Sequence, residues 1–242
     1  MKNKKYISTS LLLKKSFQII RLDYAVLLPY FISSFLLVLL SSFFLKGQAE
    51  LTENISPELF MFYLAAWLFA LLAQATTVFM AQKLANNTIP NIAESFSQAI
   101  TRFPLLVFLL LISMFFFVGI GLLLNYLLKN YFYYAALPLI MFTLVYFQIF
   151  PVIILLEKAS FFEYYRLVIN YFRNNISNII RFFLGISIIS LITILLVSSL
   201  DTTGSFSKEV LSPLIQGLSG AIITIISVIF YQVTKSIISI NA

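Results

Sequence analysis

The sequence has no cysteine and no histidine in its 242 residues, and charged residues make up only 10% of it. Without thiols and imidazoles, disulfides, cysteine nucleophiles, thiolate metal sites and histidine acid–base chemistry are excluded. An ordinary soluble domain carries about a quarter charged residues, whereas 61% of this chain is hydrophobic. These shortages argue against a water-soluble fold, and we expect no catalytic residue, metal site or cofactor.

Six uncharged apolar runs are long enough to cross a bilayer. A transmembrane helix needs roughly 20 apolar residues, because the hydrocarbon is about 30 Å thick and a helix rises about 1.5 Å per residue. The first run is longer than the ~7 to 15 residues of a signal peptide, so we expect it to be retained. What remains is too short for a second core, which predicts an all-α bundle of six transmembrane helices as one integral membrane domain, residues 1–242. The runs cover residues 25–45, 59–82, 103–128, 130–156, 182–200 and 210–234.

Basic residues collect in alternate connections between the runs. The other connections carry only Lys46, Lys129 and Lys208. Cytoplasmic loops are enriched in Lys and Arg, so both termini are predicted to lie in the cytoplasm, with the protein in the cell membrane. Attraction to anionic lipids explains the net charge of +7 without nucleic-acid binding. The enriched connections hold Lys2, Lys4, Lys5, Lys14, Lys15, Arg21, Lys83, Arg102, Lys158, Arg166, Arg173, Arg181 and Lys235.

A short amphipathic segment precedes the first, third and fifth runs. Such a helix beside a membrane span is expected to lie in the headgroup region. Asn91 with Glu94, and Ser160 with Glu163, have the spacing of helix capping boxes. We expect three interfacial helices and three repeats, residues 7–87, 88–157 and 158–242; the alternative is that any multi-pass protein has amphipathic loops. The apolar stripes are predicted to be Leu13, Phe17 and Ile20, then Ile92, Phe96, Ala99 and Phe103, then Phe162, Tyr165, Ile169 and Phe172.

Several short segments carry a resemblance that covers nearly the whole chain. They are residues 10–17, residues 96–104, Pro151 followed by Glu157 and an amphipathic helix, and residues 229–231. In these segments the chain resembles the membrane domain that precedes the catalytic domain in some glycerophosphoryl diester phosphodiesterases, and its free-standing six-helix prokaryotic relatives. It departs from that pattern at Tyr164 and Val168, where the family usually has a small residue and a serine. The phosphodiesterase domain itself is absent, so the resemblance implies no activity.

Polar residues inside the runs are amides and hydroxyls, because no ionisable residue lies near the centre of any run. Intramembrane amides most often hydrogen-bond between helices, and we favour that role over a substrate site. Gly119, Gly121, Gly217 and Gly220 are expected to permit close helix packing. The amides are Gln74, Asn125, Gln148 and Gln232.

Prolines mark two further features of the runs. Pro104 fits the start of a helix, whereas Pro138 and Pro151 are expected to kink the fourth run.

The basic edge supplies the candidate contacts for lipid or a partner protein. Glu157 and Lys158 follow the fourth run, and we expect them to form an interfacial pair linked to Arg166 or Arg173. The full candidate set is Lys14, Lys15, Arg21, Arg102, Glu157, Lys158, Arg166, Arg173 and Arg181.

Three functions are compatible with this sequence. The leading hypothesis is a non-enzymatic membrane protein that organises lipid or a partner protein at the cytoplasmic face. The alternative is a transporter or permease subunit for a lipid or small amphiphile, although no carboxylate lies in the spans to bind a coupling ion. An intramembrane enzyme is the least favoured, because phosphate-binding glycine loops, serine-centred triads and paired carboxylates are missing from the sequence.

Overall fold

The computed structural model describes residues 7–44, 57–129, 132–200 and 205–240. These residues form seven α-helices and one 3₁₀ helix, and none of them is in a strand. Six of the helices are long and apolar enough to cross a membrane, so the predicted all-α class with six membrane-length helices is confirmed. The elements are α1 (Thr9–Leu22), η1 (Tyr24–Leu27), α2 (Leu28–Phe44), α3 (Pro57–Ala85), α4 (Ile92–Leu128), α5 (Phe132–Leu156), α6 (Phe161–Leu200) and α7 (Ser205–Ile240).

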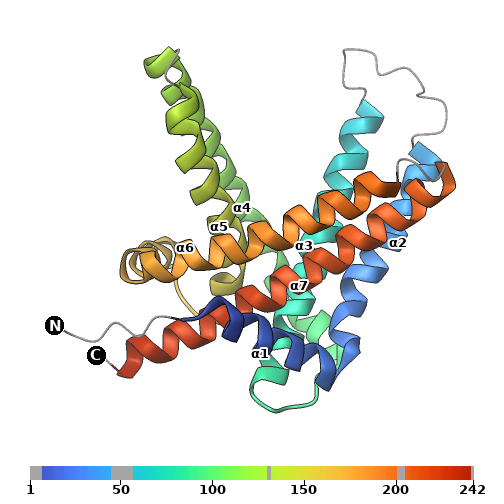
Figure 1. Cartoon of the computed structure of the whole chain (residues 1–242), viewed down its shortest axis with the longest axis horizontal. Coiled ribbons are helices and arrows are strands. Elements are labelled where there is room, and N and C mark those ends of the chain that lie inside the picture. The colour runs from blue at the N-terminus through green and yellow to red at the C-terminus, as the bar shows by residue number, and fades with distance from the viewer. Residues whose placement is uncertain (1–6, 45–56, 130–131, 201–204, 241–242) are drawn as a thin grey trace.

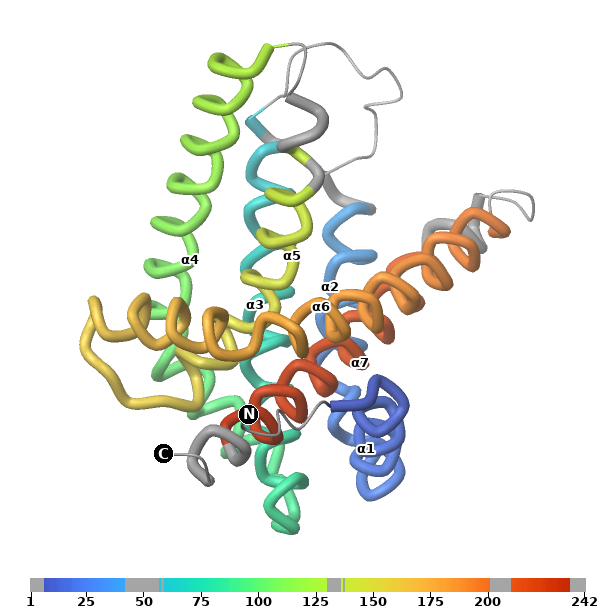
Figure 2. Tube along the Cα trace, turned by 60° about the vertical axis from the view of Figure 1, so that its left-hand side comes forward, coloured from blue at the N-terminus to red at the C-terminus, as the bar shows by residue number. Residues whose placement is uncertain are grey.

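The last helix, α7, lies at the centre of the bundle. It contacts α1, α2, α3, α5 and α6. In the span of α7, 61% of the residues are buried, and in that of α5 50%, whereas the share in the other spans is 17 to 28%. Figure 1 shows α6 and α7 side by side, crossing the α2–α3 pair and the α4–α5 pair, and Figure 2 shows α2 to α5 standing more upright than α6 and α7. The core is therefore built around α7 and α5.

The outer faces of the spans are apolar. Phe115 and Phe116 on α4 are 76% and 64% exposed, and Leu195 on α6 is 61% exposed. Monomeric soluble proteins rarely expose contiguous apolar surface on this scale, because water excludes it. A bilayer accommodates such faces without that cost, which agrees with a multi-pass membrane protein.

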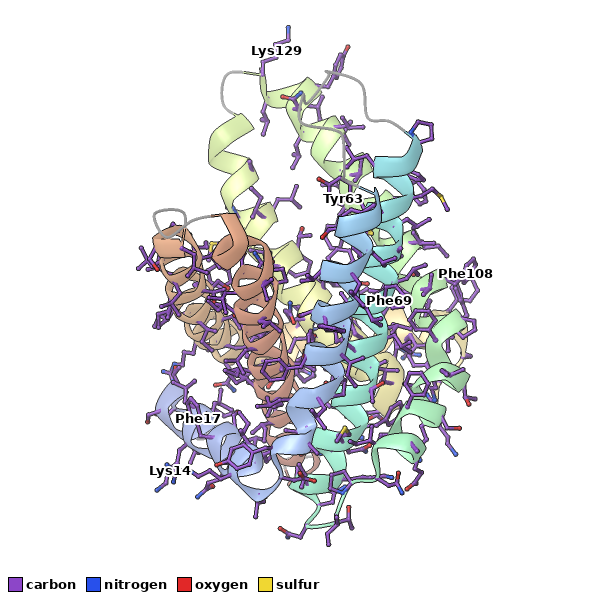
Figure 3. The ribbon with its side chains drawn as sticks, turned by 90° about the vertical axis from the view of Figure 1, so that its right-hand side faces the viewer. Lys14, Phe17, Tyr63, Phe69, Phe108 and Lys129 are labelled. Carbon is purple, nitrogen blue, oxygen red and sulfur yellow. The ribbon has the colours of Figure 1, made fainter. Side chains whose placement is uncertain are left out.

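The three amphipathic segments enter their spans in different ways. In the first, the chain breaks at Asp23, whose Oδ1 accepts a 2.8 Å hydrogen bond from Ala25 N, and α1 lies across the end of the bundle (Figure 3). The second is continuous with its span in α4, which at 37 residues is roughly 55 Å long. The third is the start of α6, which changes direction at Asn175 (φ −121°, ψ 16°). The predicted threefold repetition stays a prediction.

The predicted apolar stripes coincide with the buried faces only in part: Ile20, Ala99 and Phe172 are buried. Phe17, Phe162 and Ile169 are 51%, 81% and 65% exposed. Each segment packs one face against the bundle and leaves a neighbouring apolar face exposed. Some of its apolar residues are therefore buried in the protein and others lie on its surface. Periodicity locates an apolar face but cannot say what covers it. The buried residues are Leu12, Ser16, Ile19 and Ile20 in α1, Ser95 and Ala99 in α4, and Tyr164, Val168, Tyr171, Phe172 and Asn175 in α6.

Proline and glycine positions give mixed outcomes. Pro104 lies inside α4 and does not begin it, because the helix already starts at Ile92. The helix α5 continues through Pro138 and Pro151, whereas α6 has non-helical backbone at Asn175. A β-carbon on Gly217 or Gly220 would collide with α2, which confirms close packing there, whereas nothing lies within 4 Å of the corresponding positions on Gly119 and Gly121.

Candidate functional site

A network of polar side chains holds the end of α5. The last carbonyls of a helix have no partner within it, and Arg102 of α4 supplies one here. Its Nη1 donates to Ile154 O at 2.9 Å and to Glu157 O at 2.6 Å. The guanidinium also complements the negative end of the α5 dipole. Arg102, predicted to be a lipid contact, is instead half-buried and bonded within the protein.

Two tyrosines complete this network from α6 and α7. The side chain of Tyr164 is buried, and its hydroxyl donates to Glu157 O at 3.1 Å. Tyr231 donates to the Glu157 carboxylate at 2.6 Å, and Lys235 forms an ion pair with the same carboxylate oxygen. The expected link from Glu157 to Arg166 or Arg173 is therefore wrong: α7, which returns to this end of the bundle, brings Lys235 to the carboxylate.

The charge on Glu157 is stabilised by these contacts. Burial would raise the pKa of its carboxyl, but hydrogen bonds from Lys235 and Tyr231 and the charge of Lys235 outweigh burial, so the pKa lies below its ordinary value. A carboxylate whose pKa is lowered on folding stabilises the protein above the unfolded pKa. That stability is lost as the pH falls through the folded pKa.

We expect the wild-type protein to lose more thermal stability than Glu157→Gln when the pH is lowered from about 7 to about 3, because a carboxylate with a lowered pKa loses its contribution only below the ordinary glutamate pKa of about 4.3. Glutamine keeps the size of the side chain but cannot ionise, so its contribution does not change over this range. Melting temperatures of both proteins in detergent, measured across the pH series, give the comparison. Parallel curves would contradict the assigned role of the Glu157 charge.

Ile7, the first described residue, hydrogen-bonds to α6 near its bend. Ile7 N donates to Asn178 Oδ1 at 3.2 Å, and Arg181 Nη1 donates to Ile7 O at 3.4 Å. Thr9 packs against Gly185, whose added β-carbon would lie 3.2 Å from Thr9 Cγ2. Arg181, another predicted lipid contact, thus joins α6 to the segment leading into α1.

The remaining predicted basic contacts face outward. Lys14 lies at the end of the bundle opposite Lys129 (Figure 3), which agrees with the alternation of the connections. The carboxylates described at this end are engaged: Glu94 pairs with Lys83 at 2.7 Å, and Glu163 accepts from Ser160 N at 2.7 Å. The exposed basic residues are Lys14, Lys15, Arg21, Lys158, Arg166 and Arg173.

A second candidate site lies within the membrane-spanning part. Gln74 of α3 and Gln148 of α5 line one cavity of about 350 Å³. Neither amide has a hydrogen-bond partner among the described residues, so the expected interhelical amide bonds are not formed there. Hydroxyl groups join the helices instead. The interhelical pairs are Tyr30 with Thr224, Ser113 with Tyr146, Tyr171 with Thr234 and Thr193 with Ser219.

The other two predicted amides lie elsewhere. Asn125 is exposed near the end of α4, and Gln232 is half-buried in α7 without lining the cavity. The meeting of Gln74 and Gln148 depends on how α3 and α5 pack. Their positions along the sequence carry no signal of it.

Comparison of the chain with protein-family models, with curated protein sequences and with solved structures yields no match. The resemblance to the membrane domain of the phosphodiesterases therefore stays a prediction. The structure itself gives six helices long and apolar enough to cross a membrane, a basic end, and a cavity between the helices that is lined by two amides.

Proposed function

We propose that this protein is a non-enzymatic, multi-pass protein of the cell membrane that binds anionic lipid headgroups at its cytoplasmic face. The observation that supports this function most directly is the separation of charges at one end of the bundle. Carboxylates there are engaged by Lys83, Lys235 and the Ser160 backbone, while basic side chains on α1 and α6 face outward. By the enrichment of basic residues in cytoplasmic loops, this end faces the cytoplasm.

The helix α1 has the features of a lipid-binding surface. Leu12, Ser16 and Ile19 attach it to the bundle, while Lys14 and Lys15 are exposed. Phe17, which is 51% exposed, supplies an apolar group on the same helix as Lys14 (Figure 3). Basic residues combined with an aromatic residue are typical of helices that lie in the headgroup region. Each Lys or Arg near an anionic surface contributes about 1 kcal/mol of attraction.

We expect the combined substitution of Lys14, Lys15 and Arg21 by glutamine to reduce the retention of anionic lipid about fivefold per charge removed, since about 1 kcal/mol is a fivefold change in an equilibrium constant. The protein is reconstituted in vesicles of equal phosphatidylglycerol and phosphatidylcholine. Native mass spectrometry then counts the lipids that stay bound on release. Wild-type protein retains phosphatidylglycerol preferentially, and the preference weakens with added salt.

The matched control is Lys129→Gln, which removes a basic residue at the opposite end of the bundle and leaves the preference unchanged. Equal retention of both lipids by the wild-type protein would refute the proposal. A preference that survives the triple substitution would refute the assignment to α1. Co-purification of a stoichiometric partner protein, lost in the triple variant, would replace lipid by an acidic partner as the ligand of this surface.

A further inference from the structure

The cavity between the spans is lined by five helices. It has a volume of about 350 Å³, within the range of roughly 300 to 1,000 Å³ of small-molecule sites. Its wall is largely apolar, and the described residues that line it include no charged side chain. Trp67, the single tryptophan of the chain, stands on the same helix as Gln74. The remaining wall residues are Tyr30, Ala70, Leu71, Leu110, Met114, Phe147, Gln148, Gly220 and Ile223.

Gln74 is the unusual member of this wall. It is only 8% exposed, and no described residue hydrogen-bonds to its amide. Tyr30, on the same wall, has its own hydroxyl committed to Thr224 at 2.7 Å. The amide of Gln74 is therefore available to a molecule that enters the cavity and carries a hydrogen-bonding group.

A neighbouring cavity gives room for the apolar part of a ligand. This cavity of about 320 Å³ lies between α5, α6 and α7 and shares Gln148 and Ile223 with the first. The rest of its wall is mostly aliphatic and aromatic, with two serines; it consists of Leu144, Val145, Phe183, Ile186, Ser187, Ser190, Leu191 and Ile194. Gln148 thus stands where the amide-lined cavity meets an apolar one.

We propose that the two cavities bind an uncharged lipid that carries a hydroxyl group, with the hydroxyl between Gln74 and Gln148 and the chain in the cavity beside α6. An amide both donates and accepts hydrogen bonds, and a hydroxyl does the same, so one hydroxyl can donate to the oxygen of one amide and accept from the nitrogen of the other. A carboxylate or phosphate is disfavoured, because a buried anion without a cation is costly. This site is separate from the basic end and does not depend on lipid binding there.

The fluorescence of Trp67 measures whether the cavity is occupied. Bromine quenches indole fluorescence at close contact, so a long-chain alcohol brominated near its hydroxyl end reports occupation of the cavity. The protein is reconstituted in phosphatidylcholine vesicles without anionic lipid, which keeps the basic surface out of the experiment. We expect quenching that saturates with the alcohol, about tenfold weaker binding of its methyl ether, and no saturable binding of the carboxylic acid with the same chain.

Variants assign the site to the amides. Gln74→Leu and Gln148→Leu are each expected to weaken binding of the alcohol about tenfold, and Gln232→Leu, the same change at an amide outside the cavity, leaves it unchanged. Ala70→Phe narrows the cavity without removing a polar group and abolishes saturation. The proposal is overturned if quenching rises linearly with concentration for all three probes, without saturation. It is also overturned if saturable quenching is equal in the wild type and both amide variants. If a variant fails to fold, the comparison of the three probes on the wild-type protein still decides the question.

Discussion

Gly217→Ala is expected to destabilise the bundle by about 1–3 kcal/mol, the usual cost of overpacking. Gly217 lies where α7 crosses α2, and a β-carbon on it would overlap Ser34 Oγ and lie 3.2 Å from Tyr30 O. Ser34 is only 5% exposed, so its hydroxyl has little space to move into. The expected loss is measured as a lower unfolding midpoint when the purified protein is titrated with denaturing detergent in mixed micelles.

Two further variants separate packing from helix propensity. Alanine is about 1 kcal/mol more favourable than glycine inside a helix, so Gly121→Ala, with nothing within 4 Å of its added carbon, should be neutral or stabilising. Combining Gly217→Ala with Ser34→Ala removes the overlapping oxygen and should restore most of the lost stability. If Gly217→Ala behaves like Gly121→Ala, α2 and α7 do not cross as closely as the structure shows.

The membrane-length helices could be predicted because their cause is local. Each apolar run must satisfy its backbone hydrogen bonds within itself in the bilayer, which leaves a helix as the only open-ended solution. The helix starts were equally local: Asn91 Oδ1 accepts from Glu94 N at 3.3 Å, and Glu163 accepts from Ser160 N, as the capping-box spacing predicted. Signals of this kind extend over three or four residues.

The candidate sites could be predicted only in part, because they join residues far apart in the chain. Glu157 is a candidate from the sequence, but its partner Lys235 lies 78 residues away and appears there only as a basic residue of the tail. Likewise, Gln74 and Gln148 were both named, yet nothing along the chain says that α3 and α5 place them in one cavity. Sequence patterns gave the residue types, and the packing of the helices decided which of them meet.

Helix packing also explains why Arg102, predicted to contact lipid, bonds within the protein instead. A basic residue beside a membrane span is usually a surface group, and Arg102 lies ten positions after Ile92, the first residue of α4. Its role follows from the unbroken course of α4, which places Arg102 beside the end of α5 and the start of α6. The unbroken α4 therefore stabilises the basic end of the bundle through the contacts of Arg102.

Arg102→Met is expected to lower the free energy of unfolding by about 2–3 kcal/mol, because hydrogen bonds from a charged group contribute about 1.5–3 kcal/mol, Ile154 O loses its donor and Glu157 O keeps only the donor from Tyr164. Methionine keeps an apolar stem of similar length, so the loss reports the guanidinium rather than packing. Denaturing-detergent titration gives the difference from wild type, and Arg102→Lys should fall between the two because an ammonium lacks the planar fork of a guanidinium.

The matched control is Arg173→Met, which removes an exposed arginine from α6 and should change stability by no more than about 0.5 kcal/mol. The two arginines should also differ in the opposite sense in lipid binding. Arg173→Met weakens the retention of anionic lipid while the fold is unaffected, whereas Arg102→Met weakens the fold. Equal effects of both substitutions on stability would show that Arg102 is a surface charge, and that the contacts at the end of α5 do not hold the basic end together.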